Sequence, residues 1–596
     1  MKKLLTTTLF VVTAVTLVSF IAPVLPAQEA GQPAKTGQAR EATLDSGLTS
    51  RVDKLFEKWD KPDSPGCALG IVRDGRLIYK RGYGMANLDY NVAISPQTVF
   101  DIGSMSKQFT AMSILLLARQ GKLSLDDEIQ KYLPEVPRYQ SPITIRHLIH
   151  HTSGIRDYVQ LAALAADTWG ENVHLTDDDY LGSIVRQKQL NHKPGEEAGY
   201  DNSGYFLLGL IVKRVSGKSE REFADENIFM PLGMNNTHFD VDRTSVVKNR
   251  ATGYFVSSNA GLSAAITNRD ELDSSVEDLF LWDQNFYNNK LGGGPDLINE
   301  EVSPGMLNNG EKTEYAFGLH LDEYKGLKRV RHGGEGGGFM SEMIRFPEQK
   351  FSVMRLCNGY NIPWGQSDQV ADIFLADQFK KAPDAVKETA SASPDIISVP
   401  EKELASLTGL YVDAIRFSSI RFYMKDGKLM INAGPGYVYV LSPLGQNRFI
   451  NRERSKEVGA RIEQVFEQPI PGAPMQVKLL RGGKAIGTLA RVQDVPSSIQ
   501  LAEFAGKYRS DELAGATYTL SNKDGKLVLE AMGRKDILLI PAFGDTFLIY
   551  GLIQWYPGEL NQTLAIVTFT RNQQNAVSGF TISRDAGPRN LRFDKR

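Results

Sequence analysis

Residues 99–107 read VFDIGSMSK, and this segment carries the sharpest indication of the fold and chemistry. A helical pattern continues from Ser106 and is predicted to stop at Gly121. Ser104 and Lys107 are three residues apart, so on a helix they project from the same face. If Ser104 begins the helix, the positive end of the helix dipole favours a nucleophilic hydroxyl, and Lys107 can take its proton. Alone, this S-x-x-K motif is weak, because such tetrapeptides usually mark the start of a surface helix.

A second motif is Tyr200-Asp201-Asn202, which lies between a Pro194-Gly195 turn and the apolar run FLLGLIV. The pattern predicts a loop that enters a helix. A tyrosine at such a place can shuttle a proton between a serine and a leaving group. Asn202 can hold a substrate amide, since its side chain both donates and accepts hydrogen bonds.

A third motif, His332-Gly333-Gly334, ends the strand-like run LKRVRHGG. Glycines allow a substrate backbone to lie close against an edge strand. The backbone N–H of Glu335, which follows, could form an oxyanion hole with the N–H of Ser104. A single histidine such as His332 is more often structural than functional, so the argument rests on the three motifs together.

The order S-x-x-K, Y-x-N and H-G-G resembles the penicillin-recognising serine hydrolases. The similarity is greatest to the class C β-lactamase branch with its D-peptidase and esterase relatives, and it covers about residues 48–380. The phrase TIRHLIHHTSG, from Thr144 to Gly154, also resembles that branch.

The resemblance implies a role for each motif residue and no cofactor. Ser104 is the acylated nucleophile and Lys107 its general base or proton relay, while Tyr200 protonates the leaving group and then activates water. The implied substrate-binding residues are Asn202, His332, Gly333 and Gly334, and the implied oxyanion hole is formed by Ser104 and Glu335.

His332 departs from the pattern of many β-lactamases, which carry a lysine there that attracts the substrate carboxylate. A neutral imidazole gives much less Coulomb attraction. We therefore predict a serine acyl-hydrolase of the D-peptidase or esterase type, acting on small peptides, amides or esters. Two alternatives stay open: a class C-like β-lactamase, and a non-catalytic binding or sensor protein on the same fold.

Other site classes are disfavoured. His147, His150 and His151 could suggest a metal, but no glutamate lies between them in the zinc-protease arrangement, so we predict no metal site. No G-x-S-x-G elbow surrounds Ser104, which argues against an α/β-hydrolase. The glycine run 336–338 lacks the lysine of a phosphate loop.

The chain has 596 residues, which predicts roughly two to four domains. Strand-like runs such as CALGIV and FSVMRLCN lie at both ends of residues 48–380, with helical patterns between them. This predicts an α+β catalytic domain of the β-lactamase/transpeptidase type, with an antiparallel sheet flanked by helices. Residues 381–399 are rich in Ala, Ser, Pro and charge and predict a linker.

The remaining residues contain an internal duplication. The segment from Leu404 to Tyr411 recurs from Leu501 to Tyr508, and the Asp426-Gly427 turn recurs as Asp524-Gly525, at a constant offset of 97 to 98 residues. Short alternating runs joined by Asp-Gly turns predict antiparallel strands. We predict two β-barrels of about eight strands each, residues 400–497 and 498–596. They resemble the paired lipocalin-like barrels of D-aminopeptidases.

The N-terminus has the pattern of an export signal over residues 1–27, followed by a flexible lead-in over residues 28–47. Lys2 and Lys3 precede an apolar stretch, and Ala27 offers a cleavage point. An uncleaved anchor is the alternative. We predict an exported protein, periplasmic or secreted, with no stable membrane span in the mature chain. The net charge of −2 gives no reason to expect nucleic acid, so the predicted partner is a small-molecule or short-peptide substrate.

Only two cysteines occur, Cys67 and Cys357, and their spacing is not that of a metal site. An exported protein meets oxidising conditions, in which two cysteines can pair. The resemblance implies that the first and last strands of the sheet are neighbours, which would allow a Cys67–Cys357 disulfide. The strand registers are not known from sequence, so the pairing stays open.

Overall fold

The computed structural model describes residues 45–165, 176–239, 246–257, 261–264, 272–359, 362–379, 397–413, 418–432, 438–451, 462–470, 472–481, 483–492, 501–550, 564–584 and 587–596. Residues 44–596 form one compact unit. The predicted signal peptide lies outside the described residues, as do most of the predicted lead-in and linker. Within the described residues, no helix has the length and apolar character needed to cross a bilayer.

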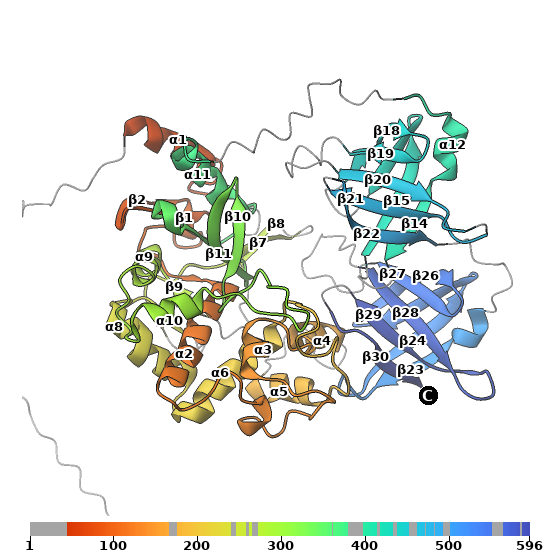
Figure 1. Cartoon of the computed structure of the whole chain (residues 1–596), viewed down its shortest axis with the longest axis horizontal. Coiled ribbons are helices and arrows are strands. Elements are labelled where there is room, and N and C mark those ends of the chain that lie inside the picture. Colours follow the sequence, from red (N-terminus) through yellow and green to blue (C-terminus); the bar gives the residue numbers. More distant parts are fainter. Residues whose placement is uncertain are drawn as a thin grey trace, which may run out of the picture. The chain divides into compact units, whose positions relative to one another are not determined.

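The catalytic domain is built on a six-stranded antiparallel sheet with the order β10-β11-β12-β13-β1-β2 (Figure 1). Its strands are β1 (Cys67–Arg73), β2 (Arg76–Tyr83), β10 (His320–Tyr324), β11 (Leu327–Gly336), β12 (Phe339–Phe346) and β13 (Phe351–Cys357). The last strand, β13, pairs with the first, β1. The α+β prediction is therefore confirmed, and the late strands complete the sheet.

Helices cover both faces of this sheet. The helices of the domain are α1 (Ser46–Phe56), α2 (Lys107–Arg119), α3 (Ile145–Ile149), α4 (Tyr158–Leu164), α5 (Asp177–Val185), α6 (Asn202–Ser216), α7 (Glu220–Ala224), α8 (Met230–Leu232), α9 (Val276–Asn285), α10 (Gly294–Glu301) and α11 (Gln366–Leu375). Alternate residues of β1 face opposite ways: Leu69 and Ile71 pack with α1 and α11, whereas Ala68 and Val72 pack with α2 and α9. Burial on both faces explains why this strand is a continuous apolar run.

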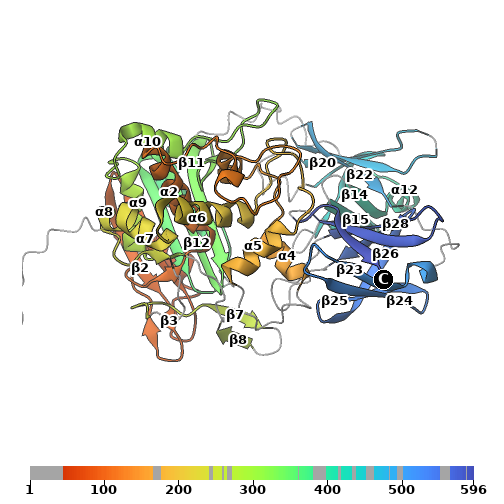
Figure 2. The same cartoon turned by 90° about the horizontal axis from the view of Figure 1, so that it is seen from below.

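Shorter strands and turns complete the domain. The strands are β3 (Met85–Asn87), β4 (Val92–Ala93), β5 (Phe100–Asp101), β6 (His238–Phe239), β7 (Tyr254–Ser257), β8 (Gly261–Ala264) and β9 (Leu272–Ser274). Single helical turns are η1 (Gly103–Ser106), η2 (Ile129–Lys131), η3 (Asp225–Phe229) and η4 (Pro347–Gln349). Helices α2 and α6, which carry residues of two of the motifs, lie against each other (Figure 2).

Cys67 and Cys357 are direct partners in the register of β1 and β13, and the structure joins them in a disulfide. The bond links positions 290 residues apart. It therefore fastens the beginning of the sheet to its last strand.

Two β-barrels follow the catalytic domain. Barrel 1 contains α12 (Glu401–Ser406), β14 (Gly409–Asp413), β15 (Ser418–Lys425), β16 (Lys428–Asn432), β17 (Val438–Val440), β18 (Ser442–Gly445), β19 (Arg448–Ile450), β20 (Ile462–Glu467), β21 (Gln476–Arg481) and β22 (Lys484–Arg491). Barrel 2 contains η5 (Leu501–Phe504), β23 (Gly506–Ser510), β24 (Ala516–Lys523), β25 (Lys526–Ala531), β26 (Arg534–Phe543), β27 (Thr546–Tyr550), β28 (Leu564–Arg571), β29 (Val577–Arg584) and β30 (Leu591–Lys595).

Barrel 2 is a closed, eight-stranded barrel, as predicted. Barrel 1 has nine strands among its described residues, so the prediction of eight is wrong there. The duplication explains the difference, because the counterpart of β26 is divided at Leu441 into β17 and β18. Matching tyrosines mark the repeat: the Tyr411 hydroxyl donates to Leu407 O at 3.0 Å, and the Tyr508 hydroxyl to Phe504 O at 2.7 Å.

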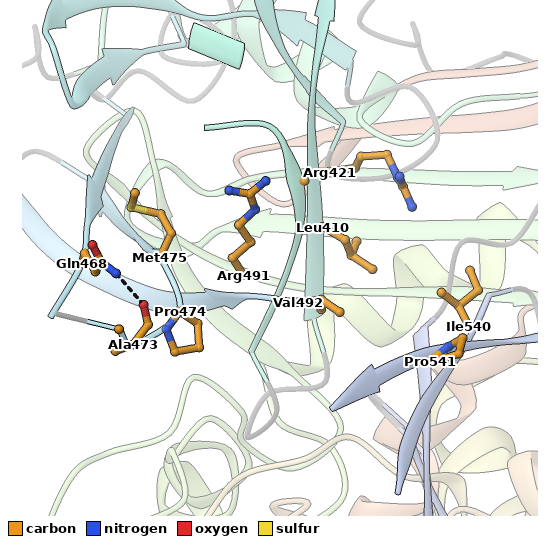
Figure 3. Close-up of a pocket in the computed structure, with 12 residues that line it drawn as sticks. Leu410, Arg421, Gln468, Ala473, Pro474, Met475, Arg491, Val492, Ile540 and Pro541 are labelled. Carbon is orange, nitrogen blue, oxygen red and sulfur yellow. Dashed lines mark hydrogen bonds between the residues drawn. The ribbon is translucent and has the colours of Figure 1, made fainter. Parts of the chain in front are cut away.

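A cavity of about 590 Å³ lies where the two barrels meet (Figure 3). Leu410 and Val492 line it from barrel 1, and Ile540 and Pro541 line it from barrel 2. Leu410 and Ile540 also belong to a small apolar cluster between the barrels. None of the predicted catalytic residues lines this cavity.

Candidate active site

Ser104 lies in the 3-10 turn η1, directly before α2 begins at Lys107. The nucleophile candidate thus precedes the α-helix rather than opening it. A Cβ added to Gly103 would lie 2.7 Å from the backbone nitrogen of Glu335. Only glycine permits so close an approach, together with the positive φ of 52°. This packing brings the backbone of the H-G-G motif up to the turn that carries Ser104.

Lys107 connects two of the three motifs. Its ammonium group donates to Ser104 Oγ and to Asn202 Oδ1, both at 3.0 Å. The residue is only 6% exposed. Its nitrogen also lies 5.1 Å from the ring centre of Tyr200, within cation–π range. The predicted nucleophile, base and asparagine therefore meet around one buried ammonium group.

Tyr200 borders the site at its exposed side, because 41% of the residue is accessible. Its ring centre lies 4.3 Å from that of His151 and 6.3 Å from that of His332. The next residue, Asp201, caps α6 by accepting a hydrogen bond from Gly204 N at 2.6 Å. That cap fixes the loop-to-helix junction which presents Tyr200 and Asn202.

His332 lies on β11 and is 3% exposed. Its Nδ1 is 2.6 Å from Gly333 O, and because a carbonyl only accepts, Nδ1 carries the proton. Nε2 then accepts from the Tyr315 hydroxyl at 3.0 Å. Burial, followed by the nearby His320 and Lys107, lowers the pKa of His332 well below its usual value. The site therefore presents a neutral imidazole.

Four residues near the motifs were not predicted as site residues: His151, Asp157, Tyr315 and Trp364. His151 packs between Tyr200 and Tyr315, and burial lowers its pKa well below the usual value. Trp364 covers Gly333, since an added Cβ there would lie 2.7 Å from the indole. His151 lies in the TIRHLIHHTSG phrase and Asp157 follows three residues after it, so that phrase was the available signal.

The three clustered histidines have different surroundings. His147 Nδ1 lies 3.1 Å from Thr144 N, His150 Nδ1 lies 3.1 Å from Tyr315 O, and His151 Nδ1 accepts from Asp201 N at 3.3 Å. Helix α3 ends at Ile149, so His151 does not continue the helical face of His147. These positions give each ring a structural partner.

The chain is similar to known proteins over much of its length. The family model described as Beta-lactamase matches residues 52–377. Penicillin-binding protein 4* of Bacillus subtilis (strain 168) is 30% identical over 331 residues, which cover 52% of this chain and 71% of that protein. The D-aminopeptidase of Gluconobacter oxydans (strain 621H) is 25% identical over 470 residues, which cover 77% of this chain and 82% of that protein.

A solved structure supports the fold over most of the chain. The octameric penicillin-binding protein homologue from Pyrococcus abyssi matches with a TM-score of 0.50 and 22% identity. The match covers 81% of this chain and 98% of that chain. At this level of identity the likeness concerns the fold.

Proposed function

This chain belongs to the Beta-lactamase family of serine hydrolases, and from that membership we propose that it cleaves small peptides, amides or esters through an acyl-enzyme on Ser104. The observation that carries the proposal is the position of Lys107 Nζ, 3.0 Å from both Ser104 Oγ and Asn202 Oδ1. This distance is within hydrogen-bond reach, as transfer of the serine proton requires.

In the proposed acylation, Lys107 first gives up to solvent the proton that it donates to Ser104 Oγ, and the resulting amine accepts the proton of Ser104 while Oγ bonds to the substrate carbonyl carbon. The backbone N–H groups of Ser104 and Glu335 would stabilise the resulting oxyanion. The oxyanion then collapses, the bond to the leaving group breaks, and Tyr200 gives that group a proton. Asn202 would position the substrate amide.

In the proposed deacylation, Tyr200 accepts a proton from water as the water oxygen attacks the acyl carbon. The bond to Ser104 Oγ breaks, Lys107 returns the serine proton to Oγ, and a carboxylic acid leaves. No step requires a metal ion or an organic cofactor.

The site chemistry favours substrates without a free carboxylate beside the scissile bond. His332 is neutral and buried. It therefore gives little of the attraction for a substrate carboxylate that a lysine at this position would give. The D-aminopeptidase relative, similar over 77% of this chain, supports an amide of a D-amino acid as a substrate. β-Lactam hydrolysis is the second candidate, supported by the family match.

Covalent labelling tests whether the chain is an enzyme. We expect a fluorophosphonate to label the wild type and not Ser104→Ala. Failure of fluorophosphonate, fluorescent penicillin and esters alike to form an adduct would favour a non-catalytic binding or sensor protein.

Substrate ranking tests the class. We expect D-amino-acid p-nitroanilides or p-nitrophenyl esters to be turned over faster than nitrocefin, with L-amino-acid p-nitroanilides as the matched stereochemical control. Nitrocefin as the best substrate by orders of magnitude would identify a β-lactamase instead.

Export is also a proposal, supported by the charged and then apolar N-terminal sequence. Intact-mass measurement of the protein from the periplasm or medium of its producing cell should give a chain that begins at Gln28. A mass that retains Met1 to Ala27 would favour the membrane anchor.

A further inference from the structure

Helix α4 joins the catalytic domain to the interior of barrel 2. It begins at Tyr158, directly after Asp157, and its far end contributes Leu161, Leu164 and Ala165 to the apolar core of the barrel. The hydroxyl of Tyr518, a barrel residue, donates to Leu164 O at 2.7 Å. This bond satisfies a carbonyl at the end of α4 that has no partner within the helix. The barrel core is thus completed by a segment from the catalytic domain.

A buried ion pair reinforces this contact just before α4. Arg156 is 1% exposed, and its Nη1 donates to Glu512 Oε2 at 2.7 Å. Glu512 lies in barrel 2 between β23 and β24, and the same oxygen accepts from Lys188 N at 3.0 Å. Arg156 Nη2 also donates to Arg589 O at 2.6 Å. Replacing Glu512 by a neutral residue would leave the buried Arg156 guanidinium without its carboxylate, which is strongly unfavourable.

Asp157, the neighbour of Arg156, holds Asn202. Its Oδ2 accepts from Asn202 N at 2.6 Å and from Asn202 Nδ2 at 2.8 Å, while its Oδ1 accepts from Gln160 N at 3.0 Å and caps α4. A carboxylate only accepts, so it selects the Nδ2 end of the Asn202 amide. The Oδ1 end is thereby turned toward Lys107. The opposite orientation would set an NH₂ group against the ammonium.

We infer that barrel 2 supports the active site: by binding α4 and Arg156 it fixes Asp157, which orients Asn202 against Lys107. This inference rests on the proposed function, because Lys107 matters there as the base. Asp157 is a positioning residue in this scheme, since it reaches the site only through Asn202. The apolar core of barrel 2 thus includes residues from another part of the same chain.

The first test distinguishes loss of the contact between barrel 2 and Arg156 from a general loss of barrel 2 stability. Glu512→Gln removes the charge that pairs with Arg156, while Glu503→Gln is the matched control, because Glu503 pairs with Arg571 inside barrel 2. We measure the second-order rate constant of fluorophosphonate acylation and the final labelled fraction. Glu512→Gln should acylate more slowly, on the order of tenfold, with the same final fraction. Glu503→Gln should match the wild type.

The second test asks whether Asp157 acts through Asn202. Asp157→Asn should slow acylation in the wild-type background but add little in an Asn202→Ala background. Additive losses would mean that Asp157 acts by another route and would overturn the inference. Equal acylation rates for Glu512→Gln and the wild type would overturn it as well. A wild type that forms no adduct with fluorophosphonate, fluorescent penicillin or esters would, in contrast, refute the proposed function itself.

Discussion

The ammonium nitrogen of Lys107 lies 3.0 Å from the hydroxyl oxygen of Ser104, within the first helical turn after the nucleophile. Lys107→Met keeps the length and burial of the side chain and removes the base. Because a positioned general base contributes roughly 10²–10⁴-fold, kcat/KM should fall by about that factor. The melting temperature should change little.

The control for this variant is Lys122→Met, at an exposed position after α2. It should keep the wild-type rate in the same p-nitrophenyl ester assay. Near wild-type turnover by Lys107→Met would exclude Lys107 as the base.

The buried imidazole of His332 leads to a prediction about pH. Burial, followed by the nearby His320 and Lys107, lowers the pKa of His332 well below the usual value, so His332 should stay neutral between about pH 5 and 8. His332→Gln should therefore leave the shape of the kcat/KM profile unchanged over this range, even if the rate falls. Disappearance of a limb near about pH 6 in the variant would show that His332 titrates there.

Glu220 leads to a prediction about stability. Burial raises its pKa to about 7, from a usual value of about 4.5. Between these pH values the Glu220 carboxyl group is ionised in the unfolded chain and protonated in the folded chain. Glu220 therefore lowers the free energy of unfolding as pH rises. Glu220→Gln removes that loss. The variant should equal the wild type below about pH 4.5 and exceed it by about 1–3 kcal/mol above about pH 7.

Thermal melts of both proteins over this pH range measure the difference. The gap should widen as pH rises toward about 7 and then stay constant. A gap independent of pH would mean that Glu220 ionises normally in the folded protein.

The Cys67–Cys357 disulfide leads to a fourth prediction. Replacing both cysteines by alanine should lower the free energy of unfolding by about 2–4 kcal/mol, because a long loop is no longer closed in the unfolded chain. Maleimide labelling of the denatured wild type should find no free thiol before reduction and two afterwards. Reductant should lower the melting temperature of the wild type but not of the double variant. Two reactive thiols before reduction would contradict the pairing.

The sequence was sufficient where a motif is local. Ser104 and Lys107 are one turn apart, and Tyr200 and Asn202 flank one helix start. Their spacing in the sequence therefore predicts how the two members of each pair lie relative to each other. The duplication likewise predicted two barrels, because similar sequences at a constant offset indicate similar folds.

The rest depends on contacts between distant segments. Asp157 looks like an ordinary N-cap in sequence, and only the docking of α6 shows that it also holds Asn202. Leu161 and Leu164 have a helical spacing that predicts burial. The spacing does not tell whether they are buried in the core of their own domain or in that of barrel 2. The break at Leu441 also escaped prediction, since one residue divides an otherwise regular strand.

The three α4 residues in the apolar core of barrel 2 limit what this barrel can offer to other molecules. A small apolar ligand that bound this core would have to compete with α4. Because α4 belongs to the same polypeptide, its effective concentration is on the order of millimolar. Because α4 never diffuses away, a weakly binding ligand would rarely displace it. The core of barrel 2, the closed barrel, is therefore already shared with α4.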